Sequence, residues 1–169
     1  MPNSRSKSTS RHPTVRVEHA LAGDLYEHLS SLEVALHRMV RARLEREFGE
    51  GEKGWWREGL PENIRTACAA RREQDDDPCE EPYGYTNLID LKSVISKNWH
   101  LFHPELPKPY GADKKKLETD FVRLNGIRNA VMHPVKQKKW TQNDLEFVRQ
   151  MRGLFQPQIS KRPSAPACN

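Results

Sequence analysis

Residues 24–44 read DLYEHLSSLEVALHRMVRARL, and their apolar side chains recur every three or four positions. The apolar stripe consists of Leu25, Leu29, Leu32, Leu36, Met39, Val40 and Leu44. This spacing predicts an α-helix with one apolar face. Asp24, with Glu27 three residues later, resembles a capping box and predicts the start of the helix. Gly49 and Gly51 predict its end, and residues 15–21 allow a short helical lead-in. A glycine-rich turn that contains Trp55 and Trp56 is expected to follow.

Four further segments show helical spacing, and no segment alternates as a half-buried strand does. The residues that predict the starts of these helices are Pro61, Asn87, Asp113 and Thr141. The helix after Asn87 is expected to end at residues 101–104 and to carry one apolar face, formed by Leu88, Leu91, Ile95 and Trp99. The fourth helix is expected to end at Pro134, because the residue before a proline avoids helical backbone angles. The sequence therefore predicts an all-α fold, an antiparallel bundle of about five helices.

The positive charge of the chain lies at its two ends. The formal net charge is +5, but residues 1–16 and 156–169 together hold six cations and no acid. The part between them is left at about −1, so the basic balance says little about the folded surface. Residues 1–14 are predicted to be a disordered basic arm, 15–156 the helical domain and 157–169 a disordered tail.

The cysteines and the hydropathy point to a cytoplasmic protein. Cys68, Cys79 and Cys168 show no paired metal-ligand spacing, and an odd number without a secretion signal fits a reducing compartment. No apolar run approaches the roughly 20 residues that cross a bilayer. We therefore expect neither a membrane segment nor a bound metal or cofactor.

The segment Arg128-Asn129-Ala130-Val131-Met132-His133 carries the most distinctive chemistry. An imidazole can move protons near neutral pH, and an arginine can bind phosphate oxygens through two N–H groups. Asn129 could orient His133 or bind a phosphate, and Lys136 lies close enough in sequence to support phosphate binding. The alternative is structural, since a histidine at a helix C-terminus also complements the helix dipole.

This motif, with several segments before it, resembles the HEPN superfamily (higher eukaryotes and prokaryotes nucleotide-binding domains). The motif looks like the Arg-polar-x-x-x-His signature of a late helix in that family. The upstream segments resemble its Swt-type branch, named for the HEPN domain of a nuclear RNA quality-control endonuclease. They are Trp55-Trp56, Leu60-Pro61, residues 85–91, Ile95, Asn98-Trp99 and Phe102. The resemblance covers roughly residues 20–155.

The resemblance implies a dimeric helical bundle that often acts as a metal-independent endoribonuclease in defence, toxin or RNA-surveillance systems. Cleavage in the family uses the ribose 2′-OH and leaves a 2′,3′-cyclic phosphate. By position, Arg128 and His133 would be the catalytic pair and Asn129 the polar residue after the arginine. The tyrosine that usually follows the motif in toxins with nucleotidyltransferase antitoxins is missing here. This departure argues against a nucleotidyltransferase antitoxin as the partner and leaves an inhibitory partner protein of unknown kind open.

The chemistry of the motif gives a separate reason to expect a homodimer. In-line attack by a 2′-OH needs a proton acceptor on the nucleophile and a proton donor on the leaving oxygen. The motif supplies one histidine per chain, so a two-fold axis would bring a second set to a shared cleft.

Other features of the sequence leave alternatives open. Lysines flank the motif helix and are candidate RNA contacts, although such runs are usually only solvated. These are Lys114, Lys115, Lys116, Lys138 and Lys139. His100 with His103, or residues 75–77, could bind a cation, but a surface role is favoured for both. Trp55 and Trp56 could stack bases, but closing one end of the bundle is favoured.

Two other functional interpretations stand beside the nuclease. One is a catalytically silent HEPN module that binds RNA, nucleotides or a partner protein, and the other is a helical scaffold with no nucleic-acid role.

Overall fold

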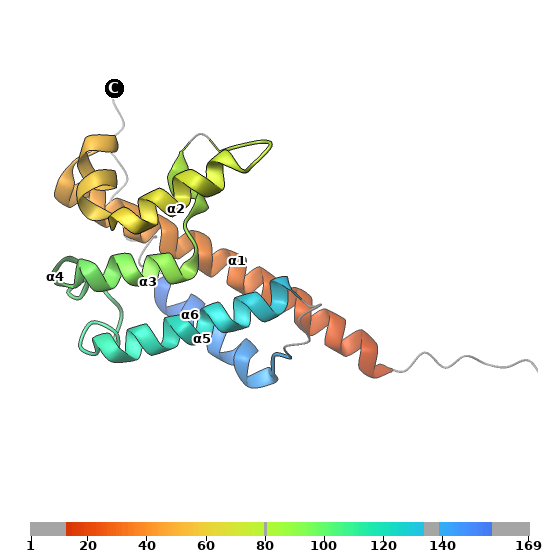
Figure 1. The fold of residues 1–169 in the computed structure, drawn as a ribbon. Helices are drawn as coiled ribbons and strands as arrows, with labels where there is room; N and C mark the ends of the chain where they lie inside the picture. Colours follow the sequence, from red (N-terminus) through yellow and green to blue (C-terminus); the bar gives the residue numbers. More distant parts are fainter. Residues whose placement is uncertain (1–12, 80, 134–138, 157–169) are drawn as a thin grey trace, which may run out of the picture.

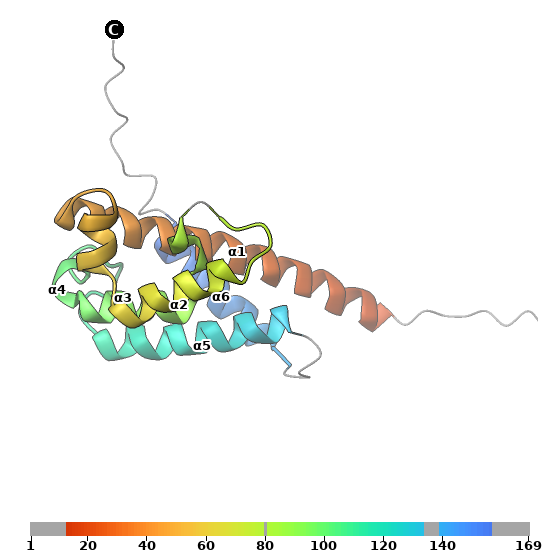
Figure 2. The ribbon, with the colours of Figure 1, turned by 45° about the horizontal axis from the view of Figure 1, so that its top comes forward.

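The computed structural model describes residues 13–79, 81–133 and 139–156, and this described part is helical without a strand. The first helix, α1 (Pro13–Phe48), is the longest, and its N-terminal part projects beyond the other helices (Figure 2). The remaining elements are η1 (Glu52–Gly59), α2 (Glu62–Glu73), η2 (Pro82–Tyr85), α3 (Leu88–Lys97), α4 (Trp99–Phe102), α5 (Lys114–Met132) and α6 (Gln142–Phe155). The all-α class is therefore confirmed.

The longer helices alternate in direction along the chain, as expected of an antiparallel bundle. Figure 1 shows α5 running opposite to α1, while α6 runs in the same direction as α1 and packs against it. The apolar stripe of α1 forms the centre of the core: Leu25, Leu32, Leu36 and Leu44 are fully buried. Phe121 on α5 and Phe155 on α6 meet edge to face in the same core, with ring centroids 6.4 Å apart.

The predicted start of the first helix is wrong. The helix begins at Pro13 rather than Asp24, so Pro13 and Thr14, assigned to a disordered arm, are helical. Asp24 lies inside α1, where its carboxylate is 3.7 Å from the Arg149 guanidinium of α6. Contact with another helix thus replaces the expected capping role. The rest of the predicted arm (1–12) and the tail (157–169) lie outside the described residues.

The predicted end of this helix is confirmed, and so are three predicted caps. Gly49 and Gly51 follow α1 with φ of 81°, a conformation that glycine adopts without strain. Asn87 forms a capping box with Asp90, and Thr141 forms one with Asp144. The Asp113 side chain accepts a hydrogen bond from the Lys116 backbone N–H at the start of α5.

The third helix is shorter than predicted. It ends at Lys97 because Asn98 leaves the helical backbone angles. The buried Asn98 amide donates to the carbonyl oxygens of Gly59 (2.8 Å) and Val94 (3.0 Å). It therefore joins the end of α3 to the end of η1, a contact that no local pattern in the sequence indicates. Trp99, predicted on the apolar face of α3, lies in α4 and stacks on His103.

The pair Trp55-Trp56 lies in a helical segment, η1, and not in the glycine-rich turn that the sequence predicts. Trp55 is buried, Trp56 is partly buried, and their rings meet edge to face. The segment packs against α1, and Gly54 within it departs from helical backbone angles. Among the helices described, none has both the length and the apolar composition needed to cross a bilayer.

Candidate functional site

Arg128 leaves α5 beside the buried face of that helix and reaches toward α1. Its neighbour Ile127 is buried in the core, while the Arg128 side chain is 26% exposed. The nearest opposite charge is Glu33 on α1, whose Oε2 lies 4.0 Å from the Arg128 Nε. That distance is too long for a hydrogen bond. Among the described residues, the Arg128 guanidinium makes no hydrogen bond, so its N–H groups remain available to a ligand.

Glu33 is a weak partner for this arginine. Burial raises the pKa of its carboxyl above the usual value, and Arg128 only partly offsets that effect. In a strong ion pair the effect of the arginine would exceed that of burial, and the net shift of the Glu33 pKa would be downward. Arg128 is therefore positioned near an acid without being neutralised by a close contact.

Arg128 lines a groove of about 700 Å³ between α1, the end of α5 and the segment around η2. The charged residues of this groove are Glu33, Arg38, Arg41, Arg71, Glu81 and Arg128. We call it the arginine groove. Four arginines against two glutamates give it a formal charge of +2, which favours an anionic ligand.

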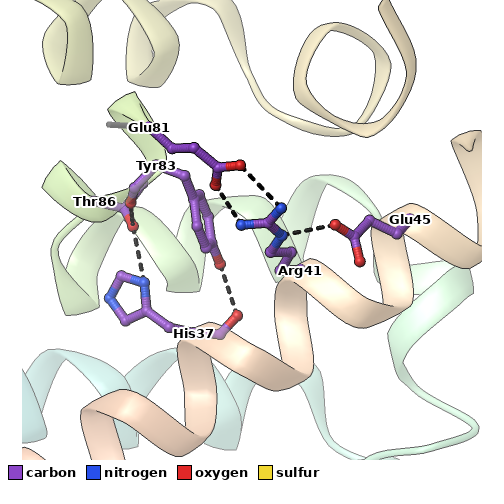
Figure 3. Close-up of polar contacts among 6 residues, drawn as sticks. All are labelled: His37, Arg41, Glu45, Glu81, Tyr83 and Thr86. Carbon is purple, nitrogen blue, oxygen red and sulfur yellow. Dashed lines mark hydrogen bonds and ion pairs between the residues drawn. The ribbon is translucent and has the colours of Figure 1, made fainter. Parts of the chain in front are cut away.

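Two of the four arginines have firm partners inside the protein. Arg71 donates to the Tyr85 carbonyl at 2.7 Å and to the Asp90 carboxylate at 2.9 Å. Arg41 bonds Glu45 at 2.7 Å and reaches both carboxylate oxygens of Glu81 (Figure 3). Arg38 is exposed and makes no ion pair or hydrogen bond with the described residues, while Arg128 has only the 4.0 Å contact with Glu33. These two arginines are the ones that a ligand could engage.

A histidine lies in the same groove. His37, on α1, follows Glu33 by four residues, so both occupy one row of the helix. Its ring Nδ1 is 3.1 Å from the Thr86 hydroxyl, and its backbone carbonyl accepts from the Tyr83 hydroxyl at 2.9 Å. Figure 3 shows how these two contacts join α1 to the η2 segment. Burial lowers the pKa of His37, against smaller raising effects of Asp90 and Thr86.

A second hollow, of about 800 Å³, lies beyond the Arg41–Glu81 ion pair. Trp55 and Trp56 form part of its wall, and we call it the tryptophan hollow. It shares Arg41, Glu81 and Tyr83 with the arginine groove. Arg41 lies over the Trp55 ring, with its guanidinium carbon 4.9 Å from the centroid. Four arginines and five glutamates line the hollow, so its formal charge is −1.

His133 and Asn129, the other predicted residues of the motif, lie at the solvent-exposed end of α5. His133 is the C-terminal cap, and its backbone N–H donates to the Asn129 carbonyl at 3.1 Å. Both residues are exposed, and neither lines the arginine groove. Within the described residues, no hydrogen bond joins Arg128 to His133. The structure thus places Arg128 in the groove and His133 just past the last turn of the same helix.

The predicted lysine contacts separate into two groups. Lys114 donates to the Ser96 carbonyl and Lys116 pairs with Asp120, both at 2.9 Å. These two and the exposed Lys115 lie about 20 Å from Arg128 along α5, at 1.5 Å per residue. Lys139 is exposed, while Lys136 and Lys138 lie outside the described residues. The lysines at the start of α5 therefore do not border the arginine groove.

The other candidate cation ligands take part in local contacts. His103 stacks on Trp99, and the Asp75 carboxylate accepts from the Tyr85 hydroxyl at 2.7 Å. The latter bond lowers the pKa of Asp75. Among the described residues, no three His, Cys, Asp or Glu side chains gather in a way that could hold a metal ion.

Sequence reasoning missed the residues of α1 and α2 that complete the groove. Glu33, His37 and Arg41 recur every four residues beside the apolar stripe, which was a usable signal for a polar row at a helix contact. Arg71 gave no such signal, because its partners Tyr85 and Asp90 are distant in sequence. The grouping of these residues with Arg128 depends on the packing of α1 against α5.

Comparison with known proteins identifies no relative of this chain. No family model matches the chain, and neither does a curated protein or a solved structure.

Proposed function

We propose that this chain is a metal-independent endoribonuclease of the HEPN type, with Arg128 and His133 as its catalytic pair. The observation that carries the proposal is the state of Arg128, which is partly buried in a groove of net positive charge and has no hydrogen-bond partner among the described residues. An arginine in this state can bind two oxygens of a phosphodiester. It can also stabilise the negative charge that develops on the phosphorus oxygens during cleavage.

The reaction proposed is attack by the ribose 2′-OH on the adjacent phosphorus. It forms a 2′,3′-cyclic phosphate and releases the 5′-oxygen, which needs a proton. His133, as an imidazolium, would supply that proton, since its exposed position at the end of α5 leaves the ring accessible. Asn129, one turn earlier on the same exposed end, would hold the ring or a phosphate oxygen.

A homodimer is part of this proposal. Met132, directly before His133, is a large apolar side chain with 44% of its surface exposed. A partner chain that covered Met132 would bring its own Arg128 and His133 toward the same region, as a two-fold axis requires. The composite site would then contain two copies of the motif.

The second candidate function is a silent HEPN module that binds RNA or nucleotides without cleaving them. It is favoured by the absence of a contact between Arg128 and His133 among the described residues. In this case the arginine groove would bind phosphate, and His133 would serve only as a helix cap.

One experiment separates the two functions. Single-stranded RNA is incubated with the full-length protein in EDTA, and the product ends are analysed. Cyclic phosphate ends that disappear in Arg128→Ala and His133→Ala support the nuclease. Arg57→Ala is the matched control, because Arg57 lines the tryptophan hollow, is exposed and pairs with Glu52. Intact RNA that is retained by the wild type and released by Arg128→Ala supports the silent module. If the protein neither cleaves nor retains RNA, only the scaffold interpretation remains.

A further inference from the structure

The proposed reaction needs a proton acceptor and a proton donor, and the motif supplies one histidine per chain. The arginine groove contains another histidine, His37, in the same chain as Arg128. We infer that the Nε2 atom of His37 accepts the proton of the attacking 2′-OH. This inference rests on the proposed nuclease function and assigns a catalytic role to a residue outside the motif.

The hydrogen bonds of Thr86 determine which nitrogen of His37 carries the proton. The Thr86 hydroxyl donates its only hydrogen to the Tyr83 carbonyl at 2.8 Å. Its oxygen can therefore only accept from His37 Nδ1, 3.1 Å away. A neutral imidazole has one N–H, so Nε2 is left with a free lone pair. This is the nitrogen that a general base needs.

Three contacts hold His37 in place, two of them on its ring. The Tyr83 hydroxyl binds the backbone carbonyl of His37, and the Tyr83 ring meets the imidazole edge to face at 5.3 Å. Tyr83 and Thr86 are both buried, so their own positions are fixed by the core. Figure 3 shows Nδ1 directed at Thr86 and the rest of the ring turned away from it. No hydrogen bond to Nε2 occurs among the described residues.

The surroundings of His37 keep it neutral near pH 7. Burial lowers its pKa below the usual value of 6.5, and this effect exceeds the opposing effect of Asp90 on α3. The other acids of the groove are Glu33 on α1 and Glu81 beside η2, and its cations are Arg38, Arg41, Arg71 and Arg128. A neutral imidazole is the form that can accept a proton.

The step balances between His37 in the groove and His133 at the exposed end of α5. The 2′-OH gives its proton to His37 Nε2 while its oxygen forms a bond to phosphorus. The bond from phosphorus to the 5′-oxygen breaks, and that oxygen takes a proton from the His133 imidazolium. Arg128 binds the non-bridging oxygens throughout. His37 then returns its proton to solvent, and His133 takes up a proton from solvent.

The test uses the full-length protein and the substitution His37→Asn. The asparagine amide can still donate to Thr86 but offers no base in place of Nε2. We expect cleavage to fall at least 100-fold, the range of general-base loss, and to lose its dependence on pH below neutrality, while RNA binding is retained. The matched control is His28→Asn, because His28 is also a partly buried α1 histidine with a lowered pKa but contacts α6 outside the groove. It should cleave at the wild-type rate.

A second measurement needs no variant and no activity. Nitrogen-15 NMR of the wild-type protein at neutral pH should show His37 protonated at Nδ1 and unprotonated at Nε2. A proton on Nε2 overturns the inference, and so does a His37→Asn variant that cleaves at the wild-type rate with an unchanged pH profile. In both cases a loss of cleavage in Arg128→Ala would leave the nuclease proposal standing. A wild type that does not cleave RNA overturns both.

Discussion

The arginine groove and the tryptophan hollow are neighbours with the same number of arginines but different pairing. In the hollow, Arg57 pairs with Glu52, and Arg65 and Arg72 donate to the carbonyl oxygens of Arg57 and Cys79. In the groove, Arg38 and Arg128 are left without close partners among the described residues. The number of arginines alone therefore does not tell which cavity has arginines without close partners. We expect ligand binding in the groove and a structural role for the hollow.

The largest expected effect is on stability, and it belongs to the hollow. Trp55→Ala removes a buried ring that contacts Tyr83 at 5.1 Å between centroids and supports Arg41. We expect a loss of about 3–5 kcal/mol in the free energy of unfolding. Urea denaturation measures it, with Arg128→Ala as the comparison. Because Arg128 makes no hydrogen bond with the described residues and its Nε lies 4.0 Å from Glu33, its removal should cost less than about 1 kcal/mol. Equal losses would refute the division between the two regions.

The next effect concerns the geometry of Arg128. Arg128→Lys keeps the positive charge but loses the planar pair of N–H groups, so we expect cleavage to fall about tenfold or more. Arg57→Lys in the hollow is the control and should leave the rate unchanged. Initial rates on one short RNA measure both. A fully active Arg128→Lys would mean that charge alone is sufficient at this position.

A smaller effect is expected for RNA affinity. Arg38→Glu reverses an exposed charge and lowers the formal charge of the groove from +2 to zero. We expect binding to weaken about tenfold and the salt dependence to flatten by about 0.7, the value per phosphate contact for single strands. Arg57→Glu changes charge by the same amount in the hollow. If both variants weaken binding equally, the RNA follows overall charge rather than the groove.

The sequence could predict the helices but not the two cavities. The class, the end of α1 and the caps at Asn87, Asp113 and Thr141 follow from spacing and local hydrogen-bonding residues. The start predicted for α1 at Asp24 was wrong, because a cap-like pattern also occurs where a carboxylate faces another helix.

The same limit applies to the candidate site. The motif in α5 indicated Arg128, but the contact of Thr86 with His37 joins residues 49 positions apart. The ion pairs of Arg41 with Glu81 and of Arg71 with Asp90 were equally invisible, because only the packed structure brings these residues near.

Tyr83 lines both cavities, and its substitution should have a modest effect on stability. Tyr83→Phe removes the hydrogen bond to the His37 carbonyl and should cost about 1 kcal/mol of stability. Burial raises the pKa of Tyr83 far above its usual value, so the hydroxyl stays protonated and the cost should not vary between pH 6 and 9. Tyr85→Phe is the control, since its bond to Asp75 is exposed. A cost that changes with pH in this range would contradict the assigned donor role.

The smallest effect tests how firmly Glu33 binds Arg128. Burial raises the folded-state pKa of Glu33 above its usual 4.5, so the folded protein binds this proton more tightly than the unfolded chain does. The resulting stabilisation is complete below pH 4.5 and is lost as the pH rises through the folded-state pKa. Glu33→Gln should therefore match the wild type at pH 4 and have a slightly higher melting temperature at pH 7. A lower melting temperature at pH 7 would mean that the ion pair outweighs the cost of burying the carboxylate. Arg128 would then form an ion pair with Glu33 much as Arg57 does with Glu52. The groove would then no longer differ from the hollow in having an arginine without a firm partner at position 128.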